Sequence, residues 1–282
     1  MLPHDAAMEP TEHPDHPLPH EDDEHDLGLV HDLATLSRPR PAARMDRRKA
    51  LTMIGGGGAA ALVLAACKIP VTGGGYAVTP TETAGPFPGD GSNGPNVLDD
   101  RGIVRQDITT SFGDHSGTAE GVPLTVEMTL LDVAGGGGPL AGAAVYLWHC
   151  DREGRYSLYS DGVTDQNYLR GIQESDADGK LTFTSIYPAA YDGRWPHIHF
   201  EIYESLDAAT SGGQKLRTSQ MAMPKATDDL VYATDGYDAS VANLARTSLE
   251  TDMVFSDGYA SQLATITGTV AKGLTATLNV GV

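Results

Sequence analysis

From about residue 123 onward, short stretches of the chain alternate strictly between apolar and polar residues. Residues 123–131 place Leu124, Val126, Met128 and Leu130 on one face, and residues 274–282 repeat the pattern. Residues 143–150 and 180–188 are further short stretches rich in β-branched and aromatic side chains. A period of two is the pattern of β-strands with one buried face, so each of these stretches is predicted to be a strand.

Glycine-rich and Asp-Gly segments separate these stretches at distances typical of hairpins. A single stretch, residues 238–255, has the composition of a helix. Short strands, frequent turn signals and one minor helix favour an all-β fold, an antiparallel β-sandwich. We expect this domain to occupy residues 86–282, after a Gly/Pro/Thr-rich linker at 68–85.

The N-terminal part of the chain has a different composition. Residues 1–45 are acidic and rich in His and Pro but poor in apolar residues, which predicts a disordered leader. Residues 46–67 follow the order of an export signal: Arg47 and Arg48, then an apolar stretch, then Leu-Ala-Ala-Cys ending at Cys67. The apolar stretch of about 16 residues is too short to be a good membrane-spanning helix.

The paired arginines resemble a twin-arginine signal, and the residues before Cys67 resemble a bacterial lipoprotein box. We therefore expect an exported protein, either a cell-envelope lipoprotein anchored through a lipid on Cys67 or an extracellular protein. A simple cleaved secretory signal is the alternative, and translation from Met45 instead of Met1 is equally compatible with the pattern.

The formal net charge of −19 argues against nucleic acids and anionic membrane surfaces as partners, because these are negative themselves. The two cysteines, Cys67 and Cys150, lie in such different contexts that a disulfide framework is improbable. Neither observation selects a substrate or an oligomeric state.

Two of the four histidines that follow Cys67 are His197 and His199, one residue apart in a predicted strand. Side chains at i and i+2 of a strand point to the same face, with Cβ atoms about 6.5–7 Å apart. That spacing allows two imidazoles to bind one metal ion at about 2.1 Å each. Two half-exposed histidines with no ligand are the competing interpretation.

Tyrosines stand out in the segments around this pair: Tyr187 and Tyr191 before it, and Tyr156 and Tyr159 in an earlier segment. A phenol releases its proton near pH 10 in water, but a hard, highly charged cation can displace it. Phenolate oxygen suits Fe(III) better than Zn(II) or Cu(I). Two phenolates and two neutral imidazoles would balance two of three ferric charges, and a hydroxide the third. Spacing alone does not show which tyrosines converge.

Three segments, "TETAGPF…GIVRQDI", "WHCDREGRY" and "SIYPAAYDGRWPHIHF", resemble the intradiol ring-cleavage dioxygenases, relatives of catechol 1,2-dioxygenase and protocatechuate 3,4-dioxygenase. The resemblance implies an antiparallel β-sandwich around a non-haem Fe(III). Its ligands would be Tyr156, Tyr191, His197 and His199.

The implied reaction is cleavage of a catechol by O₂ to a muconate-type diacid. Tyr191 would leave the metal and take up a proton, Arg194 would stabilise negative charge on the ring, and Gln220 would support the site. A surface salt bridge is the simpler role for Arg194, and a packed polar strand residue for Gln220.

Two other functions stay open at this point. One is a non-catalytic secreted β-sandwich that binds glycans with Trp195 and nearby tyrosines as a stacking platform. The other is a metalloprotein that uses the same pocket for storage or a different oxidation. Which catechol would be the substrate is not readable from the sequence.

Some positions depart from the family pattern. Phe87 stands where relatives commonly have Tyr, Ala189-Ala190 replace a Gly-Trp-like pair, and Tyr146 replaces an acid. Trp148 and Cys150 are expected in the core. His149 is expected near the site or on the surface rather than as a ligand.

Overall fold

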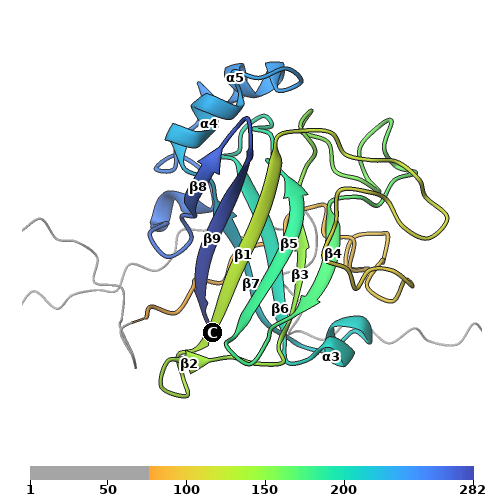
Figure 1. Ribbon diagram of the computed structural model, residues 1–282, viewed down its shortest axis with the longest axis vertical. Helices are drawn as coiled ribbons and strands as arrows, with labels where there is room; N and C mark the ends of the chain where they lie inside the picture. Colours follow the sequence, from red (N-terminus) through yellow and green to blue (C-terminus); the bar gives the residue numbers. More distant parts are fainter. Residues whose placement is uncertain (1–75) are drawn as a thin grey trace, which may run out of the picture.

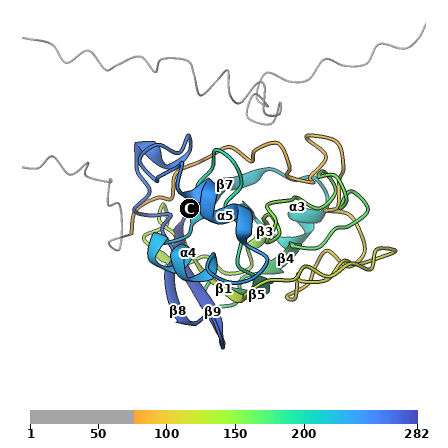
Figure 2. The same ribbon diagram turned by 90° about the horizontal axis from the view of Figure 1, so that it is seen from above.

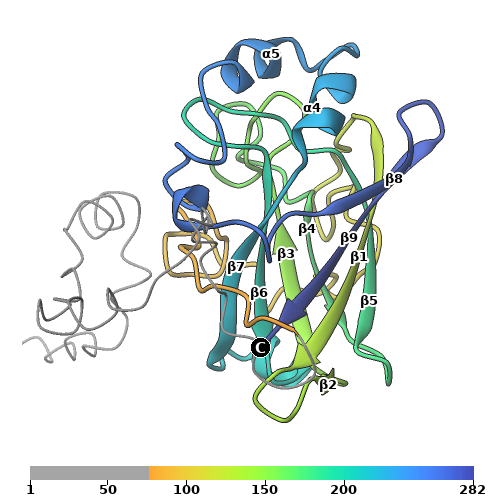
Figure 3. The same cartoon turned by 90° about the vertical axis from the view of Figure 1, so that its left-hand side faces the viewer.

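The computed structural model describes residues 76–282, which fold into two facing β-sheets (Figure 1). The predicted leader and export signal lie outside the described residues. The sheets form two layers, seen edge-on in Figure 3. One sheet has five strands: Pro123–Asp132 (β1), Gly138–Pro139 (β2), Lys180–Ile186 (β5), Thr265–Thr269 (β8) and Gly273–Gly281 (β9). The other has four: Ala144–Trp148 (β3), Arg170–Glu174 (β4), His197–Tyr203 (β6) and Lys215–Ala222 (β7).

The predicted strands are confirmed, and so is the mostly β character of the domain. On β1 the side chains of Leu124, Val126, Met128 and Leu130 are buried, as the alternation indicated. Strand β6 is buried along its whole length. Both of its faces are therefore covered, one by the core and the other by loops.

One strand pair departs from the expected antiparallel β-sandwich. Strands β1 and β9 pair in parallel, with Leu124 opposite Leu274. The other strand pairs of the two sheets are antiparallel. The direction of a hairpin is set by its short turn, but β1 and β9 are far apart in the sequence, so no turn dictates how they pair.

Within residues 76–282 three short helices occur instead of one, and the expected helix at 238–255 is wrong in extent. The helices are Leu206–Thr210 (α3), Lys225–Val231 (α4) and Asp238–Leu244 (α5). After Leu244 the chain turns, and the Thr251 hydroxyl accepts from the Ser248 N–H. Such local side-chain bonds compete with helix continuation. A 3₁₀ turn, Phe255–Asp257 (η3), follows.

Helices α4 and α5 lie together at one end of the sandwich, and α3 lies at the other end (Figures 1 and 2). No helix within residues 76–282 is long and apolar enough to cross a membrane.

Part of the predicted linker belongs to the packed structure. The Thr79 N–H donates to the Gly281 carbonyl at 3.0 Å, and the Glu82 N–H donates to the Thr218 carbonyl at 2.8 Å. The segment is therefore fixed to β9 and β7, and the ordered domain begins before residue 86.

Candidate metal centre

Strand β6 presents its two histidines on one face. Ile198, Phe200 and Ile202 point to the other face and are fully buried in the core. Loops cover the histidine face: Gly85 lies against His199, where an added Cβ would be 3.4 Å from the ring carbon Cε1. The predicted same-face arrangement of His197 and His199 is thus present.

Two phenol oxygens and two imidazole nitrogens converge beside β6. The His197 Nε2 lies 3.0 Å from the His199 Nε2, 3.4 Å from the Tyr156 hydroxyl and 3.3 Å from the Tyr191 hydroxyl. These four atoms are called the tetrad below. The four residues are the set that the family resemblance implied.

A tight turn holds Tyr156, which is 1% exposed. Its N–H donates to the Ser160 hydroxyl, and its carbonyl accepts from the Ser160 N–H, both at 2.9 Å. The buried guanidinium of Arg170 then bonds Ser157 and the carbonyls of Phe87 and Pro88. The turn with Tyr156 is therefore tied to the N-terminal segment beside it.

Tyr191 lies on the loop after β5, and α5 fixes the residue before it. The Ala190 N–H donates to the Ser240 hydroxyl at 3.1 Å, and the Asn243 amide donates to the Ala190 carbonyl at 2.8 Å. Gly154 sits against the other side, with a built Cβ only 3.1 Å from the Tyr191 Cβ. Unlike Tyr156, Tyr191 is partly exposed.

The other two candidate tyrosines are engaged elsewhere. The Tyr159 hydroxyl accepts from the Gly89 N–H at 2.9 Å. The Tyr187 hydroxyl donates to the Asp228 carboxylate at 2.6 Å. The structure thus separates Tyr156 from Tyr159, which sequence spacing could not do.

The two histidines are in the protonation state that a cation needs, whereas the two phenols would have to lose a proton. Burial lowers the pKa of both histidines well below the ordinary value, so the rings are neutral. The Nδ1 of His197 lies 2.5 Å from the Trp195 carbonyl, a contact that requires Nδ1 to carry the proton and leaves a lone pair on Nε2. Burial raises the pKa of both phenols, and the nearby positive charge of Arg194 opposes that shift.

The tetrad fits a single metal ion. Ligand atoms about 2.1 Å from one ion lie about 3 Å apart when they are neighbours at right angles, and the distances to His197 Nε2 are 3.0–3.4 Å. Three polar groups surround the lone pair of the His197 Nε2. A cation would satisfy this crowded group better than hydrogen bonds do. Elsewhere in residues 76–282, no cluster of three or more His, Cys, Asp or Glu could hold a metal.

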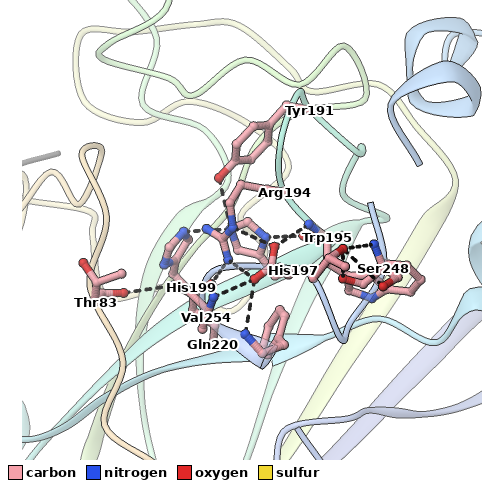
Figure 4. A network of polar contacts seen from close by, with 12 residues as sticks. Thr83, Tyr191, Arg194, Trp195, His197, His199, Gln220, Ser248 and Val254 are labelled. Atoms are coloured by element: carbon pink, nitrogen blue, oxygen red, sulfur yellow. Dashed lines mark hydrogen bonds and ion pairs between the residues drawn. The ribbon is translucent and has the colours of Figure 1, made fainter. Parts of the chain in front are cut away.

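Arg194 reaches the site from the turn before β6 (Figure 4). Its Nη2 donates to the Gln220 amide oxygen at 2.6 Å, and its Nε to the Asp252 carboxylate at 2.9 Å. Gln220 lies on β7 opposite His199, and its amide N–H₂ donates to the Thr83 carbonyl at 2.9 Å. Arg194 and Gln220 are both buried, so a surface salt bridge is the wrong interpretation of Arg194.

Aromatic rings surround the tetrad. Trp148 stacks on His199 with centroids 4.8 Å apart and planes 5° apart. Phe87 packs on Tyr156 at 4.9 Å and brings no hydroxyl. Phe255 lies edge-on to His197 at 6.5 Å.

Several other sequence expectations can be placed. Trp148 and Cys150 are buried as predicted, and His149 is buried too, which excludes a surface position. Its ring bonds the Cys150 carbonyl and the Ser185 hydroxyl. Trp195 is 3% exposed and donates to the Met223 carbonyl, so it offers no exposed stacking platform.

Sequence reasoning missed Asp252 and Thr83, the residues that hold Arg194 and Gln220. Asp252 was placed inside the expected helix and Thr83 inside the expected linker. No spacing or motif distinguishes either residue, because each reaches the site through a contact between segments far apart in the chain.

Comparison with known proteins agrees with this geometry. A family model described as Dioxygenase matches residues 93–235, about half of the chain. A solved intradiol ring-cleavage dioxygenase from Tetranychus urticae is 25% identical, covers 64% of this chain and 87% of its own, and gives a TM-score of 0.53.

Among characterised sequences, a chlorocatechol 1,2-dioxygenase from Rhodococcus opacus is 39% identical over 56 residues. A catechol 1,2-dioxygenase from Acinetobacter lwoffii is 32% identical over 119 residues. These matches span 20% and 35% of this chain, and 22% and 40% of the relatives' own lengths.

Proposed function

The chain belongs to the intradiol ring-cleavage dioxygenase family, and from that premise we propose that it cleaves a catechol-type diol with O₂ between the two hydroxyl-bearing carbons. The product would be a muconate-type diacid that contains both atoms of O₂. The observation that carries the proposal is the convergence of Tyr156, Tyr191 and His199 on the His197 Nε2.

Tyr156, Tyr191, His197 and His199 would hold a non-haem Fe(III). Two phenolates favour a hard trivalent cation, and two neutral imidazoles add donors without adding charge. When bound, this ion would act as a Lewis acid that binds the catecholate and makes its ring reactive toward O₂.

Tyr191 is the phenol best placed to change partners during the reaction. It is partly exposed, whereas Tyr156 is buried and fixed by Ser160. As a phenolate, the Tyr191 oxygen would accept one of the two hydroxyl protons of the incoming catechol. Tyr156, His197 and His199 would stay in place throughout.

Arg194 would act by electrostatics. Its guanidinium is buried beside the tetrad and stays positively charged, so it stabilises negative charge that develops on the substrate. Gln220 would position this guanidinium through the bond from Nη2.

We also infer that the protein is exported, either as a lipoprotein anchored through a lipid on Cys67 or as an extracellular protein with a simply cleaved signal. The support is the order of arginines, apolar stretch and Leu-Ala-Ala-Cys at residues 46–67. The mass of the mature N-terminus would test this, since an acylated Cys67 differs from a simply cleaved one.

The activity is tested by oxygen uptake with a panel of catechol, protocatechuate and hydroxyquinol. We expect consumption of one O₂ per diol and, with ¹⁸O₂, two labelled oxygens in a ring-opened diacid. A protein that contains iron but consumes no O₂ with any diol would indicate storage or a different oxidation.

A further inference from the structure

Asp252 is a buried carboxylate that the family match does not cover. It lies on the segment between α5 and η3, past residue 235 where that match ends, and it is 1% exposed. A buried carboxylate is costly unless hydrogen-bond donors surround it. Its partners therefore show what the residue is placed to do.

Both oxygens of Asp252 accept hydrogen bonds. Oδ2 accepts from the Arg194 Nε at 2.9 Å and the Trp195 N–H at 2.7 Å. Oδ1 accepts from the Arg194 Nη2 at 3.3 Å and from two backbone N–H groups of its own segment, those of Val254 and Phe255. One carboxylate thus joins the Arg194 side chain, the backbone beside it and the turn at 254–255.

These contacts fix the orientation of the guanidinium. The Asp252 carboxylate accepts a hydrogen bond from Nε along one edge of the guanidinium. Gln220 on β7 accepts from Nη2. The Thr83 carbonyl accepts from the Gln220 amide and fixes it in turn. Nε and Nη2 are both engaged, which leaves Nη1 without a hydrogen bond to any described residue. A long, flexible arginine would otherwise sample several rotamers.

We propose that Asp252 is a positioning residue for the dioxygenase reaction: it fixes the Arg194 guanidinium so that its charge faces the substrate bound at the tetrad. This inference rests on the proposed function. Asp252 touches none of the tetrad side chains through the contacts described, so it acts through Arg194.

A purely structural role is the competing explanation, because the bonds to the Val254 and Phe255 N–H groups are those of a turn cap. A double-mutant cycle between Asp252 and Arg194 separates the two. The variants are Asp252→Asn, Arg194→Gln and the pair together, each measured for kcat, KM, iron content and visible spectrum. The melting temperature of the metal-free protein is measured in parallel.

Asp252→Asn should lower kcat roughly 10–100-fold with a much smaller change in KM. Iron content and spectrum should stay unchanged. In the Arg194→Gln background the same substitution should lower kcat less than about twofold, because the group it positions is already gone. Losses of kcat that multiply in the double variant would overturn the proposal, and so would loss of iron from Asp252→Asn.

The melting temperature gives a readout that does not depend on activity. Asp252→Asn removes the negative charge that pairs with the buried Arg194, and this should lower the melting temperature by roughly 10 °C. The double variant should regain at least about half of that loss. If Asp252→Asn does not fold, folding of the double variant supports the proposal, and failure of both overturns it.

Asp176→Asn is the matched control. Asp176 also accepts two backbone N–H groups, from Asp178 and Lys180, in an exposed turn without an arginine. The Asp176→Asn substitution should leave kcat and KM unchanged. Wild-type protein that binds iron but turns over no diol would refute the proposed function, and the melting-temperature cycle would still decide whether Asp252 and Arg194 act together.

Discussion

A tyrosine hydroxyl becomes a useful ligand when a cation displaces its proton, and two tyrosines here lie where one cation could do so. Tyr156 and Tyr191 face the His197 Nε2 at 3.4 and 3.3 Å. Burial raises the pKa of both phenols even beside the positive charge of Arg194, so neither would ionise near neutral pH without a bound cation. A bound metal ion would therefore have to ionise the two phenols.

Tyr156→Phe removes one of two oxygen donors and should weaken iron retention roughly 10–100-fold. The visible phenolate-to-iron absorption should weaken and shift, because Tyr191 remains as the second phenolate donor. Tyr159→Phe is the control, because its hydroxyl bonds the Gly89 N–H instead. Iron analysis and absorbance of both variants check this. Unchanged absorbance in Tyr156→Phe would mean that Tyr156 is not a ligand.

The sequence predicted the histidine pair from period two alone, since strand geometry fixes which neighbours share a face. It could not choose among four tyrosines, because Tyr156 and Tyr159 differ by three residues in an irregular loop. The family resemblance indicated Tyr156, and of the two it is Tyr156 whose hydroxyl lies beside the His197 Nε2. The choice has a physical basis in the turn closed by Ser160, which no periodicity reveals.

At the scale of elements, β6 is the platform and loops from both directions cover it. Gly85 has φ of +71°, and its built Cβ would contact His199 at 3.4 Å. The segment with Gly85 is anchored on β7 and β9, so it has little freedom to move away.

Gly85→Ala should therefore strain the backbone by about 1–2 kcal/mol. Its methyl would lie in contact with the His199 ring, so a shift that relieves the strain would also displace His199. Gly94→Ala provides the control, since Gly94 has φ of +96° with nothing within 4 Å of its built Cβ. Both variants should lose stability in thermal unfolding, but Gly85→Ala alone should also lose iron. Equal iron content in the two would show that the His199 contact is unimportant.

Helix α4 contributes a buried carboxyl that should make stability depend on pH. Burial raises the pKa of Asp228 to about 8, even though the Tyr187 hydroxyl bonds it. In the unfolded chain its pKa is about 4. Between these values the unfolded chain releases a proton that the folded protein keeps, so stability falls as pH rises through this window.

Asp228→Asn removes this titration. The difference in melting temperature between variant and wild type should shift in favour of the variant by roughly 5 °C from pH 5 to pH 8. Thermal unfolding at the two pH values measures it. A constant difference would show that Asp228 is ionised in the folded protein.

Alternation predicted the strands but not the extent of the helix at 238–255. Residues beyond Leu244 are rich in Ser, Thr and acids, whose side chains bond the local backbone. The parallel pairing of β1 with β9 was equally hidden, because long-range pairing depends on the closure of the whole sheet rather than on either strand.

Over the whole molecule, the site is assembled from segments that are distant in the chain. Thr83 precedes the part that matches the family model and Asp252 follows it, yet both hold the pair formed by Arg194 and Gln220. The tetrad lies within the matched residues. The tetrad residues were therefore recognisable from motifs, whereas the residues that support Arg194 and Gln220 emerged only from the fold.

The central claim is that the tetrad binds one ferric ion. Titration of metal-free protein with Fe(III), followed by visible absorbance and iron analysis, tests it most directly. We predict a visible band that saturates at one iron per chain and changes when catechol is added. Absence of a band, or binding that does not saturate at one equivalent, would contradict the account.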